Sequence, residues 1–363
     1  MRQVAARWVL TLGVCLAIPA TPAWAQRTTL KLATIVPDGS IWDKGLKQMG
    51  TEWQTATGGR DTLTVFSGGS QGDEPTVIRK LRLNALQGAS LTVVGLAAID
   101  PAFNTFNVPF FFQSYDELNA VVDQMTPVLR QRLEARGYVL LNWGHGGWLQ
   151  IFSKQPVQTV ADLKRLRLYT SAGDDRMTQW YKANGFQPRA MAMTDILTGL
   201  STGMLDAMPT TPLAAMSFQW HKQTPFMLDT GIAPVVGATV VTRRAWEAMT
   251  PADRTALQDS ARRLEAQLRT SVPQQDALAV TLMGTQGLKT TKATGPEWQQ
   301  MAASLGTTMR GQMVPADIFD LAVKARDGYR AQRAAPPTRA ATPSAPASAV
   351  GRATAPTATP RAR

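Results

Sequence analysis

Apolar and polar positions along the chain alternate in short segments that are separated by longer segments of helical spacing. Residues 30–36 alternate and then become apolar, which predicts a strand that ends at the turn formed by residues 37–40. A helix to about Thr57, a strand at 63–66 and helical spacing over 74–83 come next. This succession of strands and helices predicts an α/β fold.

The same pattern continues to the middle of the chain. Residues 91–94 predict a third strand, 107–112 are an apolar segment, and 115–123 and 127–136 predict two helices, the second ended by Gly137. Residues 138–143 predict the strand that completes a first lobe.

The stretch 160–212 is the most informative part of the sequence. It predicts a helix at 160–164, a strand at 165–170, a helix ending at Ala183, a strand at 189–193, a helix closed by Gly203 and a strand from Leu205. Parallel βαβ units of this kind leave ligand-facing loops at the ends of their strands.

The last third predicts one strand and then helices. Residues 234–242 are apolar and β-branched and predict a strand that returns to the first lobe. Thr250 and Pro251 cap a long amphipathic helix, which we expect Pro273 to kink or interrupt. Two shorter helices are predicted at 295–305 and 315–330.

Both ends of the chain differ in composition from its body. Arg2 and Arg7, the apolar residues 8–18 and Ala23-Trp24-Ala25 are typical of a cleaved secretory signal, with an uncleaved membrane anchor as the alternative. We therefore expect residues 1–25 to be removed and the mature protein to be periplasmic. The single cysteine, Cys15, lies in that segment, so the exported protein has no disulfide and no cysteine-based metal site. Residues 331–363 are almost entirely Ala, Pro, Thr, Ser and Arg and predict a disordered tail.

The charge of the chain is concentrated at these two ends. The formal net charge of +12 falls to +5 when Arg2, Arg7 and the five arginines of residues 331–363 are subtracted. Acids and bases are interspersed in the remaining body, which makes nucleic acid a poor candidate partner.

Two short motifs suggest a hydrolase, but their order along the chain is wrong for one. Gly68-Gly69-Ser70-Gln71-Gly72 matches a nucleophile elbow, whereas His145-Gly146-Gly147 follows it and does not precede it as an oxyanion loop does. The other histidine, His221, has no acid tied to it by a local pattern. No metal-ligand pair, nucleotide motif or cofactor motif is present, so we expect a protein that is not an enzyme and has no cofactor.

Several of these segments resemble one known family in their order and spacing. DLKRLRL (162–168), TDILTGLSTGMLDA (194–207), LKLATIVPDGSIWDKG (30–45) and NVPFFFQSYDEL (107–118) are similar to the DctP-type solute-binding subunit of tripartite ATP-independent periplasmic (TRAP) transporters. The resemblance implies a two-lobe periplasmic-binding-protein fold with a hinge and a long interlobe helix. It implies lobe I at 26–148 plus 238–250, lobe II at 149–237, and a bracing helix with C-terminal helices at 251–330.

The resemblance also implies anion-binding positions, and this sequence departs from the family at each of them. Tyr169 stands where the family has its carboxylate-binding arginine, Leu149 where a second arginine is common, and Met208 where an asparagine is usual. Arg165 and Arg167 lie nearby as substitutes, but we expect both at the lobe surface. The remaining cleft candidates are neutral or aromatic: Trp42, Thr92, Trp148, Tyr169 and Thr210, with Trp143 and Trp180 as further tryptophans that ordinary core packing also explains.

The resemblance thus implies a monomeric solute-binding protein that delivers a small organic ligand to a TRAP-type permease. The departures predict a ligand that is neutral or aromatic and not a simple carboxylate. The alternative on the same fold is a periplasmic ligand sensor or a hydrophobic-ligand carrier with a different membrane partner.

Overall fold

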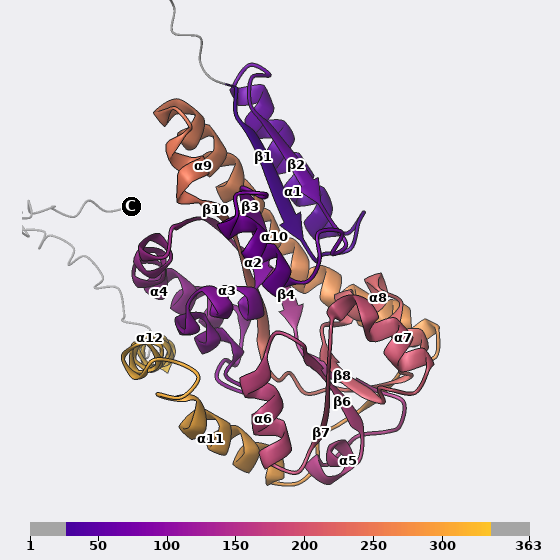
Figure 1. Ribbon diagram of the computed structural model, residues 1–363. Helices are drawn as coiled ribbons and strands as arrows, with labels where there is room; N and C mark the ends of the chain where they lie inside the picture. The colour runs from indigo at the N-terminus through magenta and orange to yellow at the C-terminus, as the bar shows by residue number, and fades with distance from the viewer. Residues whose placement is uncertain (1–26, 335–363) are drawn as a thin grey trace, which may run out of the picture.

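The computed structural model describes residues 27–334 (Figure 1). The predicted signal segment and Cys15 lie outside the described residues, as does the predicted tail from residue 335 onward. The last helix runs to Ala334, which is four residues beyond residue 330, where the sequence pattern placed its end.

A five-stranded sheet forms the upper part of the molecule in the view of Figure 1. In spatial order its strands are β2 (Thr62–Phe66), β1 (Thr29–Thr34), β3 (Gly88–Thr92), β10 (Pro234–Thr242) and β4 (Tyr138–Trp148). Strands β1, β2 and β3 are parallel, and β10 is inserted antiparallel between β3 and β4. The return of residues 234–242 to the first sheet agrees with the sequence pattern.

A six-stranded sheet forms the lower part. Its order is β11 (Lys289–Thr291), β9 (Phe226–Leu228), β5 (Gln150–Ser153), β8 (Ala207–Thr210), β6 (Arg167–Ser171) and β7 (Gln187–Met191). Two crossings join the sheets, one from β4 into β5 and one from β9 into β10. They lie side by side, because the amide of Leu149 donates to the carbonyl of Ala233 at 2.7 Å and the amide of Ile232 donates to the carbonyl of Leu149 at 2.8 Å.

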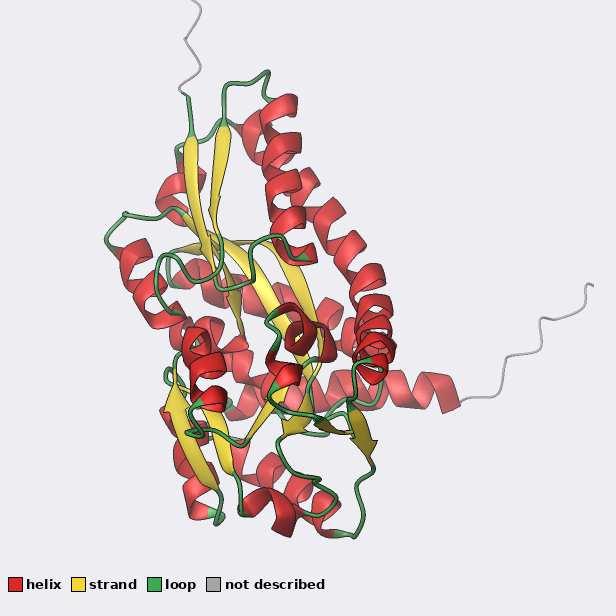
Figure 2. Cartoon of the chain, turned by 90° about the vertical axis from the view of Figure 1, so that its right-hand side faces the viewer, coloured by secondary structure: helices red, strands yellow, loops and turns green. Residues whose placement is uncertain are grey.

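Helices cover both sheets (Figure 2). They are α1 (Ile41–Ala56), α2 (Glu74–Arg82), α3 (Val93–Ile99), α4 (Tyr115–Ala135), α5 (Val160–Lys164), α6 (Asp175–Ala183), α7 (Ile196–Ser201), α8 (Pro212–Ser217), α9 (Arg243–Glu247), α10 (Pro251–Thr285), α11 (Glu297–Met309) and α12 (Ala316–Ala334). Three 3-10 helices, η1 (Pro101–Asn107), η2 (Met193–Asp195) and η3 (Trp220–Lys222), complete the set.

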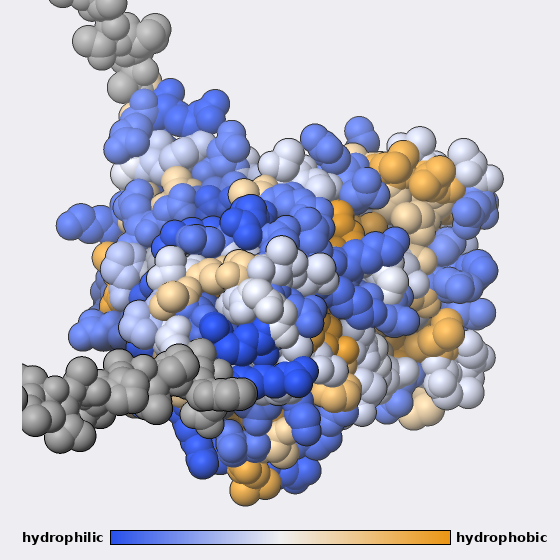
Figure 3. Space-filling model, turned by 90° about the horizontal axis from the view of Figure 1, so that it is seen from above, coloured by the Kyte–Doolittle hydropathy of each residue, from blue (hydrophilic) through white to orange (hydrophobic). Residues whose placement is uncertain are grey.

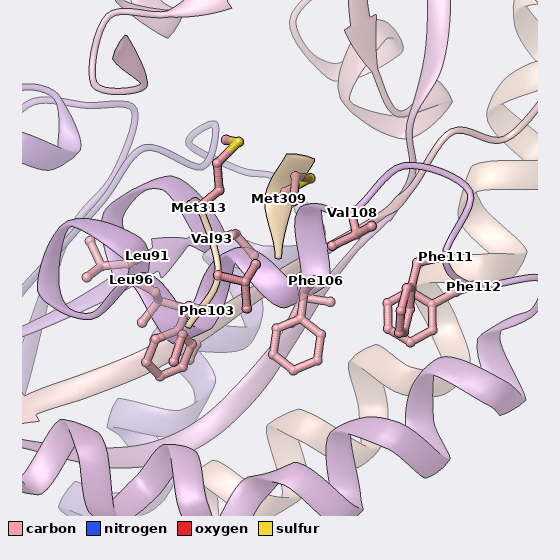
Figure 4. Packing of buried hydrophobic residues seen from close by; sticks show 14 of the residues in the cluster. Leu91, Val93, Leu96, Phe103, Phe106, Val108, Phe111, Phe112, Met309 and Met313 are labelled. Atoms are coloured by element: carbon pink, nitrogen blue, oxygen red, sulfur yellow. The ribbon is translucent and has the colours of Figure 1, made fainter. Parts of the chain in front are cut away.

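The long helix α10 packs on both sheets. Its residues from Leu257 to Val272 belong to the core between α1 and the first sheet, whereas Ala279 and Met283 belong to the core of the second sheet. A third and larger core lies beneath α3, η1 and α4, where Phe103, Phe106 and Met309 are fully buried (Figure 4). Because α10 contributes to the cores of both sheets, it spans the two halves of the molecule as the resemblance implied.

Two prolines lie inside continuous helices, although the sequence pattern predicted a division or an interruption at each of them. Pro127 is within the single helix α4, which we expected as two helices, and α10 continues without interruption through Pro273. An interior proline costs about 3 kcal/mol. In α4 the burial of Leu118, Met125 and Leu129 on one face stabilises by about 1.5–3 kcal/mol for each side chain, which outweighs that cost.

The third predicted strand begins and ends earlier than its apolar pattern suggested. The strand is β3, and Val93 and Val94 already belong to α3 because Thr92 caps that helix: its hydroxyl accepts from the amide of Val94 at 3.2 Å. The prediction of a strand over 91–94 was therefore wrong for its second half.

Hydrophilic residues cover most of the face seen from above, with separate hydrophobic patches among them (Figure 3). No helix within residues 27–334 is both long and apolar enough to cross a membrane.

Candidate ligand-binding cleft

Two adjoining chambers lie between the sheets. The inner chamber has a volume of about 120 Å³ and the outer chamber about 260 Å³. Thr92, Met193, Ala214 and Val235 line both, so the two chambers share a wall. Each chamber takes residues from both halves of the molecule, which is the position of a ligand cleft in a two-lobe protein.

The inner chamber lies over the first sheet and is mostly apolar. Trp42 and Leu46 of α1, Leu264 and Leu268 of α10, and Phe218 after α8 surround it. The indole nitrogen of Trp42 donates to the carbonyl of His145 at 2.7 Å, which fixes the ring between α1 and β4.

The outer chamber carries more hydrogen-bonding groups. Tyr169 and Ser171 reach it from β6, Thr210 and Thr211 from the end of β8, and Asp174 from the cap of α6. Burial raises the pKa of the Tyr169 phenol, so its hydroxyl is neutral and can donate at pH 7. Burial likewise raises the pKa of Asp174, although the amide of Met177 donates to its carboxylate at 3.0 Å.

Four of the five predicted site residues lie together at this cleft. Trp42 lines the inner chamber, Tyr169 and Thr210 line the outer chamber, and Thr92 lines both. Tyr169 and Thr210 come from the neighbouring parallel strands β6 and β8: Tyr169 is the middle residue of β6, and Thr210 is the last residue of β8. Their role in ligand contact stays a prediction.

Trp148 lies outside both chambers. Its ring packs at right angles against Tyr115, with 5.3 Å between centroids, and a Cβ atom on Gly231 would overlap the indole. Trp143 and Trp180 are also core residues: Trp143 packs on Phe106, and Trp180 packs on Phe186. For these last two, ordinary packing was the alternative that the sequence left open.

Neither nearby arginine reaches the cleft. Arg165 caps the C-terminus of α5 and has a side chain that is 78% exposed, so our placement of this residue on the strand with Tyr169 was wrong. Arg167 is on β6, but its guanidinium makes a two-pronged bond with Asp206, with both N–O distances at 2.6 Å. This pairing lowers the pKa of Asp206 and fixes Arg167 at the base of the strand.

A buried carboxylate behind Thr92 was not predicted from the sequence. Glu74 of α2 accepts from the amide of Thr92 at 2.5 Å, from its hydroxyl at 2.7 Å and from the amide of Gly95 at 3.0 Å. These donors belong to the first turn of α3, where the helix dipole favours an anion. Burial nevertheless raises the pKa of Glu74. The Asp73-Glu74 pair resembles an ordinary helix start, so the long-range contact has no local signal.

A second buried carboxylate lies behind the crossing between the sheets. Asp276 of α10 accepts from the amide of Leu213, the second residue of α8, at 2.8 Å and from the amide of Trp148 at 3.2 Å. Burial raises its pKa to about 6. One carboxyl group thus joins the long helix, the crossing strand and the start of α8.

The residues of the hydrolase-like motifs are not assembled into a catalytic group. Burial lowers the pKa of His145 to about 4, so its ring is neutral at pH 7. His221 has both ring nitrogens engaged, with the carbonyl of Ala215 at 3.2 Å and with Gln286 at 2.9 Å. Ser70 lies in the turn after β2, next to Gly68 and Gly69, which have φ angles of 65° and 70°. Among residues 27–334 no cluster of three or more potential metal ligands is found.

Comparison with known proteins decides the family. The profile of bacterial extracellular solute-binding protein family 7, DctP, matches residues 32–313. The chain belongs to this family. Its members are extracytoplasmic receptors that bind small organic ligands and work with TRAP permeases, and the family is not enzymatic.

Relatives of known name are distant. The 2,3-diketo-L-gulonate-binding periplasmic protein YiaO of Escherichia coli is 25% identical over 210 residues, 57% of this chain and 64% of that protein. The C4-dicarboxylate-binding periplasmic protein DctP of Rhodobacter capsulatus is 22% identical over 241 residues, 65% of this chain and 72% of that protein.

Solved structures share the two-lobe fold. DctP7 of Bordetella pertussis, an extracytoplasmic solute receptor binding pyroglutamic acid, superposes with a TM-score of 0.77 at 22% identity, covering 83% of this chain and 99% of that one. A TRAP solute-binding protein of Xanthobacter autotrophicus Py2 with bound β-D-galacturonate also has a TM-score of 0.77, at 18% identity, covering 82% and 99%. The α/β two-lobe prediction and the family prediction are confirmed.

Proposed function

We propose that this protein is a periplasmic TRAP solute-binding subunit, exported by a cleaved N-terminal signal, that captures an uncharged or aromatic organic ligand and delivers it to the membrane permease. One observation carries the proposal for the ligand. Among the residues that line the two chambers in the described part of the chain, none is lysine or arginine.

The electrostatic cost of binding an acid supports this choice. A carboxylate that enters a buried site without a paired cation loses several kcal/mol of hydration. A neutral hydrogen bond from the Tyr169 hydroxyl returns only about 1 kcal/mol. Asp174 lines the outer chamber and adds repulsion whenever it is ionised.

The lining also suits a neutral ring. Tyr169 offers a ring face and a hydroxyl, Thr210 a hydroxyl, and Met177 and Tyr181 apolar surface on the same chamber. The ligands named for the related proteins above are acids, so this proposal separates the present chain from them in substrate class while keeping the fold.

Calorimetry against a matched panel tests the proposal. The panel contains succinate, malate, pyruvate and sialic acid beside neutral aromatic and isoprenoid-like compounds. We expect micromolar binding only among the neutral compounds. Micromolar binding of an acid that Arg167→Ala weakens strongly would contradict the proposal, because it would show that this arginine leaves Asp206 to pair with ligand.

The mostly apolar inner chamber favours one alternative, a hydrophobic-ligand carrier that docks on another membrane partner. The two functions differ in delivery and not in binding. Uptake of the bound compound by vesicles that contain the cognate TRAP permease, lost when the protein is omitted, supports the transport function. Tight binding without uptake supports the carrier.

A further inference from the structure

Four polar side chains form a row across the floor of the inner chamber. Thr34 on β1, Ser90 on β3, Thr239 on β10 and Asn142 on β4 all line it. They are in register on four neighbouring strands, since Thr34 pairs with Ser90, Ser90 with Thr239, and Thr239 with Asn142. Partners in register point to the same face of a sheet, so the four side chains point together into the chamber.

One atom of this row lacks a protein partner. Asn142 is only 2% exposed, and its amide nitrogen donates to the carbonyl of Trp143 at 2.9 Å, which fixes the orientation of the amide. Its Oδ1 atom has no hydrogen-bond partner among the described residues. A buried acceptor without a donor is destabilising, so an unpaired Oδ1 on a residue that lines a cavity indicates a position for a donor.

The other walls of the chamber are mostly apolar, with Thr92 and His145 as the further polar residues. Trp42, Leu264 and Leu268 lie opposite the row, and Thr34 and Thr239 are themselves 3% and 2% exposed. The chamber therefore has a polar surface on the side of the first sheet and a hydrophobic surface on the side of α1 and α10. Gly144 and Gly237, paired on β4 and β10, continue the floor toward the outer chamber and contribute no side chains to fill it.

We propose that the inner chamber is a second subsite of the cleft, which takes a small ring or branched group bearing a neutral hydrogen-bond donor such as a phenol or alcohol hydroxyl. Asn142 Oδ1 accepts from that donor, and the Thr239 hydroxyl lies beside it on the neighbouring strand. The chamber of about 120 Å³ is close in size to an engineered apolar cavity of about 150 Å³ that holds benzene, so one ring fills it. This inference rests on the proposed function, since it assigns part of the same cleft to the proposed ligand.

Phenol and toluene are the probes, because they match in size and differ by one hydroxyl. The mature full-length protein is titrated with each, and NMR follows the Asn142 side-chain amide and the Trp42 indole N–H. We expect both signals to shift and phenol to bind at least tenfold more tightly than toluene, which corresponds to about 1.4 kcal/mol.

Two near-isosteric variants test the row itself. Asn142→Leu and Thr239→Val should each reduce the preference for phenol at least threefold and leave toluene binding within a factor of two. Thr64→Val makes the same substitution as Thr239→Val at an exposed position of β2 that lines neither chamber, and it should keep the preference. Circular dichroism confirms that each variant is folded.

Equal binding of the two probes, or shifts confined to residues of the outer chamber, would overturn the proposal. So would a crystal structure in phenol with only ordered water in the inner chamber. Failure of the proposed function would give a different result. An acid would then bind most tightly in the calorimetric panel, while the Tyr169→Ala variant would still bind phenol more tightly than toluene in the inner chamber.

Discussion

At the scale of single residues, Tyr169 distinguishes this cleft from one that binds a carboxylate through an arginine. Its side chain lines the outer chamber together with Thr210 and Asp174, whereas the arginine on the same strand, Arg167, is paired with Asp206. We expect Tyr169→Ala to weaken a neutral ligand at least tenfold in calorimetry, because both ring contact and hydrogen bond are lost. Tyr169→Phe removes the hydroxyl alone. Retained affinity in Tyr169→Phe would assign recognition to the ring, and unchanged affinity in Tyr169→Ala would refute the role of this residue.

Asp276 predicts a pH dependence of stability. Its pKa is about 6 in the folded protein against an ordinary 3.8, so the folded state holds the proton more tightly than the unfolded state. Stability from this group is fully present below pH 3.8 and is lost as the pH rises through 6. The loss is at most about 3 kcal/mol, from the size of the shift.

Chemical unfolding at pH 4.5 and pH 7 of the wild type and of Asp276→Asn measures this loss. The variant cannot ionise, so its stability relative to the wild type should rise with pH. Asp320→Asn is the control, because Asp320 is exposed and paired with Arg310 on the surface. A difference between wild type and Asp276→Asn that is constant with pH would contradict the assignment.

At the scale of elements, Pro273 lies in α10 at the junction between the two cores. Val272 is the last residue of α10 packed in the core of the first sheet, and Ala279 is the first in the core of the second. Proline has no amide hydrogen, so the carbonyl of Arg269 lacks its helical donor. We expect Pro273→Ala to raise the free energy of unfolding by about 1 kcal/mol or more, measured by thermal unfolding.

Pro127→Ala in α4 is a matched control. Pro127 is also inside a helix and is exposed, so its replacement leaves no cavity. We expect a similar gain in stability there. A loss of stability in Pro273→Ala with a gain in Pro127→Ala would show that the proline supports the junction itself.

Elements with strong periodicity could be predicted from the sequence, and those decided by distant contacts could not. Residues 160–164 and 234–242 were predicted with the observed bounds, since helical spacing and a β-branched apolar run are local signals. The start of α3 depends on the Thr92 cap and on its contact with Glu74, eighteen residues earlier, and the continuity of α4 depends on burial against the first sheet. The long-range contacts behind these two features cannot be predicted from the local sequence pattern.

The same distinction applies to the cleft. Tyr169 and Thr210 could be placed from strand ends and family positions, because parallel strands present their carboxyl ends together. Trp148 could not: one residue before the crossing, its direction is set by Gly231 and Tyr115, which come from distant parts of the chain. The polar row depends on register across four strands, which no single segment encodes.

For the whole molecule, the paired crossings and α10 are the connections about which two lobes rotate in proteins of this fold. We expect the radius of gyration in small-angle scattering to fall when saturating neutral ligand is added. An unchanged radius with binding confirmed by calorimetry would refute closure. Removal of residues 335–363 should leave both the affinity and the change in radius as they are, since the cleft is lined entirely by residues 34–268.

The proline in α10 has a consequence for affinity that involves no contact with ligand. A receptor that binds only when closed shows a dissociation constant divided by the fraction of molecules already closed. A missing hydrogen bond at the junction lowers the energy needed to bend α10 and so sets that fraction before any solute arrives. Substitution of Pro273 should therefore scale the affinities for all ligands by one common factor and leave their ranking unchanged, whereas substitution of Tyr169 reorders them.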